Sequence, residues 1–164
     1  MDILKPKLKV DSLQKINLEY FRKLAMQGII IDLDNTIVPW DVDMISREAD
    51  SFLKKALALN YKICLLSNAR KKRTENVAGQ YQIEYLSLAF KPRKAAFSKA
   101  LTRIGLRAEQ VLVIGDQVFT DILGGNRAGC FTILVSPLSK KEFTGTKILR
   151  FFESLLTIGN PGQK

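Results

Sequence analysis

The chain has 164 residues, of which 46% are hydrophobic and 26% charged, enough for one globular domain with a hydrophobic core. It contains no histidine, which excludes histidine general bases, histidine triads and most transition-metal sites. The formal net charge is +10, and residues 62–107 alone hold eleven Lys/Arg against two acidic residues. Such a basic block is most often a solvated face, and it can also recruit phosphates, nucleic acid or an anionic membrane.

Three features of the sequence bear on its location. Charged residues interrupt every apolar run well before the roughly 18–20 residues that a membrane span needs, and residues 1–10 lack the apolar core of a secretory signal. Cys64 and Cys130 lie within apolar stretches, which indicates reduced core residues rather than a disulfide or a metal site. We therefore expect a cytoplasmic protein, with possible peripheral contact on the inner face of the membrane as an open alternative.

Residues 12–27 are expected to form the first helix, within an N-terminal helical extension over residues 1–27. Ser12 is a typical N-cap residue, and Gly28 follows the expected end. The apolar side of this helix would consist of Leu13, Ile16, Tyr20 and Leu24. Packing against the core is the ordinary role of such a helix, and contact with a membrane surface is the alternative.

After this helix, short apolar segments alternate with helical ones, which is typical of βαβ units around a parallel sheet. The expected strands are 29–33, 62–66, 83–88, 111–115 and 130–135. The expected helices between them are 46–59, 71–80, 93–104 and 118–128, followed by a C-terminal helix at 146–157 and a tail to residue 164. The pattern predicts a single α/β domain over residues 1–164: a three-layer, Rossmann-like parallel sheet of about five strands with helices on both faces.

Polar residues follow four of these strands at the point where each strand ends. They are Asp32, Asp34 and Thr36, then Ser67 and Asn68, then Lys91, then Asp116 and Asp121. Because the carboxyl ends of parallel strands lie at one edge of a sheet, we expect these side chains to share a crevice. Oxygen ligands of this kind suit Mg²⁺, a carboxylate can attack phosphorus, and a second carboxylic acid can protonate the leaving oxygen.

The set Asp32-x-Asp34-x-Thr36, Ser67, Lys91-Pro92 and Gly115-Asp116-x4-Asp121 resembles the four motifs of the haloacid dehalogenase (HAD) superfamily phosphatases. The resemblance implies that Asp32 is the nucleophile of an aspartyl-phosphate intermediate, Asp34 the general acid/base, and Lys91 a brace for nucleophile and phosphate. It implies phosphate contacts from Thr36, Ser67 and Asn68. It also implies Mg²⁺ held by Asp32, the Asp34 carbonyl and Asp116, with Asp121 supporting or joining them.

Within the superfamily the chain is similar to subfamily IIIA, and to its phosphatidylglycerophosphate phosphatase-like branch, through "GIIIDLDNTIVPW", "LLSNA", "FKPRK" and "GDQVFTDILGGNRAG". That implies a phospholipid head group as substrate. Thirty residues separate Thr36 from Ser67 and twenty-two separate Asn68 from Lys91, too few for an inserted cap domain. A capless HAD core with an open crevice is therefore expected, which favours a large or surface-bound substrate.

Several alternatives stay open on the sequence alone. Ser67 and Asn68 suit helix capping, Lys91 suits a solvated surface, and Asp116 and Asp121 suit a turn and a helix start. The same open site would serve nucleic-acid ends, phosphoproteins or soluble phosphates, although few aromatics are available for stacking on bases. A non-catalytic basic binding module is the third possibility.

Cys64 and Arg70 have the Cys-x5-Arg spacing of cysteine phosphatases, but Cys64 lies within an apolar strand, where a thiolate is costly.

Overall fold

The computed structural model describes residues 2–39, 42 and 44–139, so the expected helix 146–157 and the tail to residue 164 lie outside the described residues. Six strands of the described part form one parallel sheet in the order β1-β6-β5-β2-β3-β4. The strands are β1 (Leu8–Val10), β2 (Gly28–Ile31), β3 (Lys62–Leu66), β4 (Glu84–Leu86), β5 (Val111–Gly115) and β6 (Phe131–Val135). The five expected strands are confirmed, and β1 is an addition.

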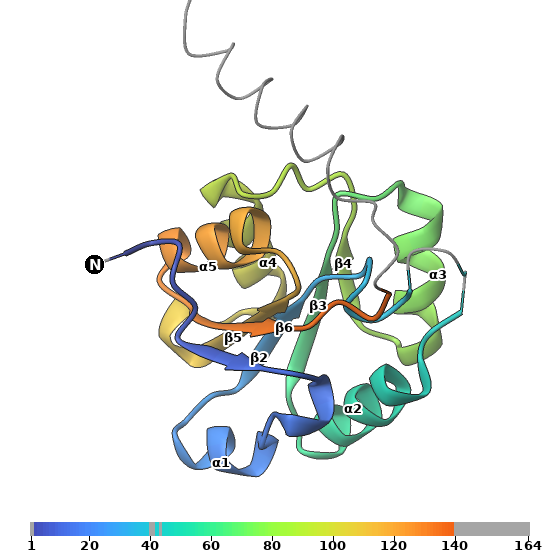
Figure 1. The fold of residues 1–164 in the computed structure, drawn as a ribbon, viewed down its shortest axis with the longest axis horizontal. Coiled ribbons are helices and arrows are strands. Elements are labelled where there is room, and N and C mark those ends of the chain that lie inside the picture. Colours follow the sequence, from blue (N-terminus) through green and yellow to red (C-terminus); the bar gives the residue numbers. More distant parts are fainter. Residues whose placement is uncertain (1, 40–41, 43, 140–164) are drawn as a thin grey trace, which may run out of the picture.

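Helices cover both faces of this sheet, as Figure 1 shows for α4 and α5 (Leu123–Ala128) on one side and α1 (Leu18–Lys23) and α2 on the other. The longer helices are α2 (Arg47–Ala58), α3 (Lys71–Tyr81) and α4 (Lys94–Ile104). Alternate residues of a strand face opposite sides of a sheet. Accordingly Ile29 and Ile31 of β2 lie in one buried cluster with residues of α2 and α3, whereas Ile30 lies in another with residues of α4. The expected three-layer α/β architecture is confirmed.

Local signals explain where these helices begin and end. The Ser46 hydroxyl accepts a hydrogen bond from the Ala49 amide (3.1 Å) and caps α2. Gly105 and Gly129 end α4 and α5 (Leu123–Ala128) in the left-handed conformation, at φ of 63° and 87°. Each helix therefore stops where the chain must turn back into the next strand.

The single helix expected over residues 12–27 is wrong. The structure has a 3-10 turn, η1 (Leu13–Lys15), and a separate short helix, α1 (Leu18–Lys23). The helix begins at Asn17, whose side chain accepts a hydrogen bond from the Tyr20 amide (2.9 Å), while Ser12 makes no capping bond. The expected apolar side is also split, because Leu13 and Ile16 are buried whereas Tyr20 and Leu24 are 54% and 51% exposed.

The segment expected as one helix over 118–128 begins instead with a π-helical turn, η3 (Val118–Ile122), which continues into α5. Such turns widen the helix by one residue and are frequent at functional sites. Within η3, Phe119 is exposed while Thr120 and Asp121 are buried. The turn therefore places the Asp121 carboxylate inside the protein.

No inserted cap is present in the part of the chain that the structure describes. Between Thr36 and Ser67 the regular elements are α2 and β3, and between Asn68 and Lys91 they are α3 and β4. The expected capless core is therefore confirmed. None of the described helices is both long enough and apolar enough to cross a bilayer.

Candidate active site

The loop after β2 buries the carboxylate of Asp32 and leaves that of Asp34 partly exposed. The Asp32 amide donates a hydrogen bond to the Ile114 carbonyl (2.9 Å), which continues the pairing of β2 with β5 and leaves Asp32 only 7% exposed. The chain then reverses at Asn35, which has a φ of 62° and donates to the Val38 carbonyl (2.8 Å). Asparagine tolerates this left-handed conformation better than most residues. Asp34 is consequently held at the partly exposed rim of the site.

Lys91 joins two of the predicted acids. Its ammonium group donates to Asp32 Oδ1 and to Asp121 Oδ1, the latter at 2.7 Å, and the residue is only 3% exposed. A buried ammonium needs such partners, because an unpaired charge in the interior is strongly unfavourable. The alternative of a solvated surface lysine is therefore excluded. A Cβ atom at position 115 would collide with the Asp121 side chain, so glycine there makes room for this arrangement.

Asn68 fixes the backbone of Lys91. Asn68 Oδ1 accepts a hydrogen bond from the Lys91 amide (2.8 Å), and its amide nitrogen donates to the Lys91 carbonyl (3.4 Å). The Ser67 hydroxyl is fully buried and accepts a hydrogen bond from the Ala69 amide (2.9 Å). Neither side chain caps α3, whose N-cap residue is Arg70, so the capping alternative is excluded. The phosphate contacts expected from Ser67 and Asn68 stay predictions, and the geometry adds a positioning contact from Asn68.

Thr36 and Asp116 approach the same site from β2 and β5. The Thr36 hydroxyl lies 3.5 Å from Asp116 Oδ1 as a weak hydrogen bond. Asp121 Oδ2 accepts a hydrogen bond from the Gln117 amide (3.2 Å), so both Asp121 oxygens already have protein partners. Asp121 thus holds Lys91 and the loop after β5 in place, whereas Asp116 keeps more of its acceptor capacity for a ligand.

The acidic cluster, defined as Asp32, Asp116 and Asp121, fits a divalent cation. Each residue offers one carboxylate oxygen, and the three oxygens lie within 4.8 Å of one another. Three carboxylates against one lysine leave two surplus negative charges when all are ionised. An all-oxygen donor set with this surplus suits a hard divalent ion. The Asp34 side chain is outside the cluster, so the expected part of Asp34 in metal binding rests on its backbone carbonyl and stays a prediction.

The pKa values reflect the same crowding of charge. Burial, outweighing the attraction of Lys91, raises the pKa of Asp32 to about 7. Burial and the neighbouring Asp32 and Asp121 carboxylates raise the pKa of Asp116 to about 8. Interactions with Asp121 and Asp32 raise the pKa of Lys91 despite its burial, so Lys91 stays charged throughout the physiological range.

We expect Mg²⁺ to raise the melting temperature more at about pH 8 than at about pH 5. The folded protein retains the Asp32 and Asp116 protons to higher pH than the unfolded chain, so metal-free stability falls as pH rises from about 4 to about 8. A divalent ion requires the deprotonated carboxylates and therefore binds more tightly over the same range. Thermal unfolding with Mg²⁺ and with EDTA at both pH values measures the difference. An equal Mg²⁺ shift at both pH values, or an undiminished shift in Asp116→Asn, would contradict the assignment.

Arg73 is a site residue that the sequence did not single out. Its Nε lies 3.2 Å from Asp34 Oδ1, and its terminal nitrogen donates to the carbonyls of Pro39 and Val42 (3.3 Å each). Arg73 thus ties the Asp34 carboxylate to the loop after β2. Burial raises the pKa of Asp34 even though Arg73 and Lys91 oppose the shift. A carboxyl group with a raised pKa is suited to donate a proton.

Cysteine-based chemistry is excluded on structural grounds. Cys64 is fully buried in β3, and burial raises the pKa of its thiol to about 12. Both cysteines are free, as expected.

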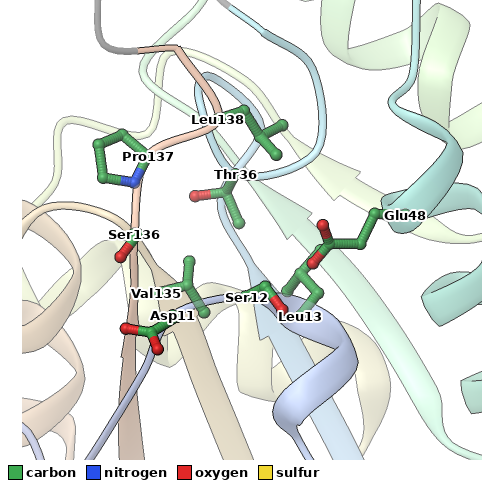
Figure 2. Close-up of a pocket in the computed structure, with 9 residues that line it drawn as sticks. All are labelled: Asp11, Ser12, Leu13, Thr36, Glu48, Val135, Ser136, Pro137 and Leu138. Atoms are coloured by element: carbon green, nitrogen blue, oxygen red, sulfur yellow. The ribbon is translucent and has the colours of Figure 1, made fainter.

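Figure 2 shows a pocket of about 210 Å³ that is lined in part by Thr36. Thr36 is the one candidate site residue in its lining, and the three acids of the cluster are not part of it. Its wall comes from the segment after β1, from α2 and from the end of β6; the lining residues are Asp11, Ser12, Leu13, Thr36, Glu48, Val135, Ser136, Pro137 and Leu138. The acidic cluster and Lys91 therefore lie outside this pocket, which adjoins them through Thr36.

Known proteins resemble this chain in sequence. The family profile described as HAD-hydrolase-like matches residues 89–139. "Probable phosphatase YqeG" of Bacillus subtilis is 33% identical over 144 residues, covering 88% of this chain and 84% of that protein. "Phosphatidylglycerophosphate phosphatase 1, chloroplastic/mitochondrial" of Arabidopsis thaliana is 24% identical over 146 residues, covering 84% of this chain but only 42% of that protein.

Solved structures share the fold. An uncharacterized protein from Listeria monocytogenes superposes with a TM-score of 0.58 at 18% identity, covering 81% of this chain and 98% of that one. The deoxy-D-mannose-octulosonate 8-phosphate phosphatase YrbI of Haemophilus influenzae gives 0.56 at 18% identity, covering 69% and 70%. Because the chain is 33% identical to YqeG over most of the length of both proteins, it belongs to the HAD-like hydrolases and is a phosphatase of that family.

Proposed function

We propose that this phosphatase is an Mg²⁺-dependent phosphomonoester hydrolase that acts through an aspartyl-phosphate at Asp32 and removes the terminal phosphate of phosphatidylglycerophosphate. The observation that carries the reaction is the buried contact of Lys91 with Asp32 and Asp121, beside Asp116. It supplies a fixed carboxylate nucleophile, a permanent positive charge and a cluster of oxygen ligands in one place.

The proposed steps use side chains at the edge of the sheet. A carboxylate oxygen of Asp32 attacks phosphorus, so that an O–P bond forms while the bond to the leaving oxygen breaks and Asp34 donates a proton to that oxygen. Asp34 then takes a proton from a water molecule, which attacks the aspartyl-phosphate and releases inorganic phosphate and free Asp32. Lys91 and the hydroxyls of Thr36 and Ser67 would compensate charge on the phosphoryl oxygens. When bound, Mg²⁺ would add further charge compensation through Asp32, Asp116 and the Asp34 carbonyl.

Three observations support a lipid head group as substrate. Two relatives at 24% identity, from Arabidopsis thaliana and Chlamydomonas reinhardtii, are named phosphatidylglycerophosphate phosphatases. The chain spans 42% and 53% of their lengths, so the substrate is carried over only as a proposal. The capless site admits a phosphate still attached to a lipid, and the loops around it are rich in Lys and Arg.

A panel of substrates tests this proposal. We expect Mg²⁺-dependent phosphate release from phosphatidylglycerophosphate in mixed micelles, with a kcat/KM about tenfold or more above that for p-nitrophenyl phosphate or a 5′-phosphorylated oligonucleotide. Preference for the oligonucleotide or for a phosphopeptide would overturn the lipid assignment but would leave the phosphatase activity established. No turnover of any phosphate would favour the non-catalytic binding module.

A further inference from the structure

Two bulky apolar side chains are exposed next to the reaction site. Leu88 and Phe90 are 52% and 59% exposed, although the residue that follows them, Lys91, is buried. Both adopt a left-handed backbone, with φ of 49° and 57°. This conformation is unfavourable for large side chains, whereas asparagine and aspartate tolerate it better. The loop thus holds two apolar side chains out into solvent in a backbone form that their residue types disfavour.

The loop that carries these side chains is paired with the loop after β3. The Leu88 amide donates to the Ala69 carbonyl (3.1 Å), and the Ala89 amide donates to the Ser67 carbonyl (3.0 Å). Residues 67–72 and 87–94, which we call the docking rim, therefore form one surface. Because Lys91 lies within it and contacts Asp32, the docking rim borders the proposed nucleophile.

The charge of the docking rim is of a single sign. Its exposed cations are Arg70, Lys71, Lys72, Arg93 and Lys94, and it contains no acidic residue. The Arg93 guanidinium lies over the Phe90 ring, 5.5 Å from its centroid, so charge and apolar surface occur side by side. Other segments at the same edge add exposed apolar residues, Met44 in the loop after β2 and Phe119 in η3 after β5, which are 76% and 44% exposed.

We propose that the docking rim seats this protein on an anionic bilayer, with Leu88 and Phe90 inserted among the lipids and the flanking cations against their head groups. Apolar side chains framed by Lys and Arg match the interface of such a membrane. A surface that binds nucleic acid typically offers aromatic side chains that stack on the bases, whereas Leu88 is aliphatic. The inference deepens the proposed function and rests on it, because bilayer docking brings a lipid-borne phosphate to Asp32 without extracting the lipid.

Co-sedimentation with vesicles in EDTA measures docking without turnover. We expect binding to vesicles of phosphatidylglycerol mixed with phosphatidylcholine and little binding to phosphatidylcholine alone. The variant Leu88→Asn/Phe90→Asn keeps residues that tolerate positive φ and should weaken binding about tenfold or more. The matched control is Tyr20→Gln/Leu24→Gln, which removes similarly exposed apolar side chains within and directly after α1, before the amino end of β2. It should change binding less than about twofold.

A second variant tests the charge. Lys71→Gln/Lys72→Gln/Arg93→Gln should weaken binding to the anionic vesicles by about tenfold or more, and raising NaCl from about 0.1 to about 0.5 M should reduce wild-type binding. Equal loss in the control variant, or equal binding to both vesicle types, would overturn the proposal. So would a wild-type protein that ignores vesicles but self-associates or binds a protein through Leu88 and Phe90.

The docking rim and the proposed function can fail separately. Vesicle binding that depends on Leu88 and Phe90, without hydrolysis of phosphatidylglycerophosphate, would support the docking rim as a membrane-binding surface and contradict the proposed substrate. Hydrolysis of the lipid in detergent micelles, without vesicle binding, would support the proposed substrate and contradict membrane binding by the docking rim. When both hold, the ratio of lipid to p-nitrophenyl phosphate turnover should fall about tenfold or more on vesicles in the Leu88→Asn/Phe90→Asn variant.

Discussion

Asp32→Asn should reduce the turnover of every phosphomonoester by about 10⁴-fold or more while leaving the fold intact. An amide oxygen is a far weaker nucleophile than a carboxylate, so phosphoryl transfer to the side chain would stop. The fold should persist because Asn retains an acceptor for Lys91 and because Lys91 keeps its bond to Asp121. Phosphate release, with circular dichroism and thermal unfolding of the same preparation, measures both effects.

A control in the neighbouring pocket sharpens this experiment. Asp11→Asn makes the same chemical change in the lining of the pocket beside Thr36, and it should alter turnover by less than about twofold. Near-normal activity in Asp32→Asn would reject the aspartyl-phosphate mechanism. A comparable loss in Asp11→Asn would instead place the chemistry in the pocket.

Lys91→Met should destabilise the protein by about 3–5 kcal/mol at about pH 8, in addition to abolishing turnover. Methionine resembles the lysine stem in shape, but the change leaves Asp32 and Asp121 buried without their cation. At about pH 5 the Asp32 carboxyl group can be protonated, because burial already raises its pKa to about 7. The loss of stability should therefore be smaller at the lower pH, as urea unfolding at both pH values would show.

Lys54→Met is the matched control for this second experiment. Lys54 forms an exposed ion pair with Asp50 at 2.9 Å, with 68% of its side chain exposed. Removing it should change the free energy of unfolding by less than about 1 kcal/mol. Equal costs in the two variants, or a cost in Lys91→Met that does not depend on pH, would show that Lys91 does not compensate buried carboxylates.

The sequence predicted the position of the site because one geometric rule decides it. In a parallel sheet all strands end at the same edge, so Asp32, Lys91 and Asp116 had to converge once their strands were recognised. The strands were recognisable because their buried apolar runs stand between helical segments with clear caps, such as Ser46 and Gly129.

The features that the sequence did not reveal depend on contacts that leave little local pattern. β1 has only three residues, and its pairing with β6 joins positions 125 residues apart along the chain, as for Leu8 and Ile133. The helix expected over residues 12–27 is too long because Asn17 stands among apolar residues at helical spacing, whereas its capping bond sets the start of α1. Arg73 sits in the run "ARKKR", where sequence alone does not tell which cation faces Asp34.

The placement of β1 has a consequence for the behaviour of the protein in concentrated solution. An unpaired outer strand exposes a row of amide and carbonyl groups on which another molecule can build a continuous sheet. β6 is apolar and would present such a row, but β1 covers it and carries the exposed Lys9. At the opposite border β4 offers only three residues. The short N-terminal strand therefore protects the molecule from aggregating through its own sheet.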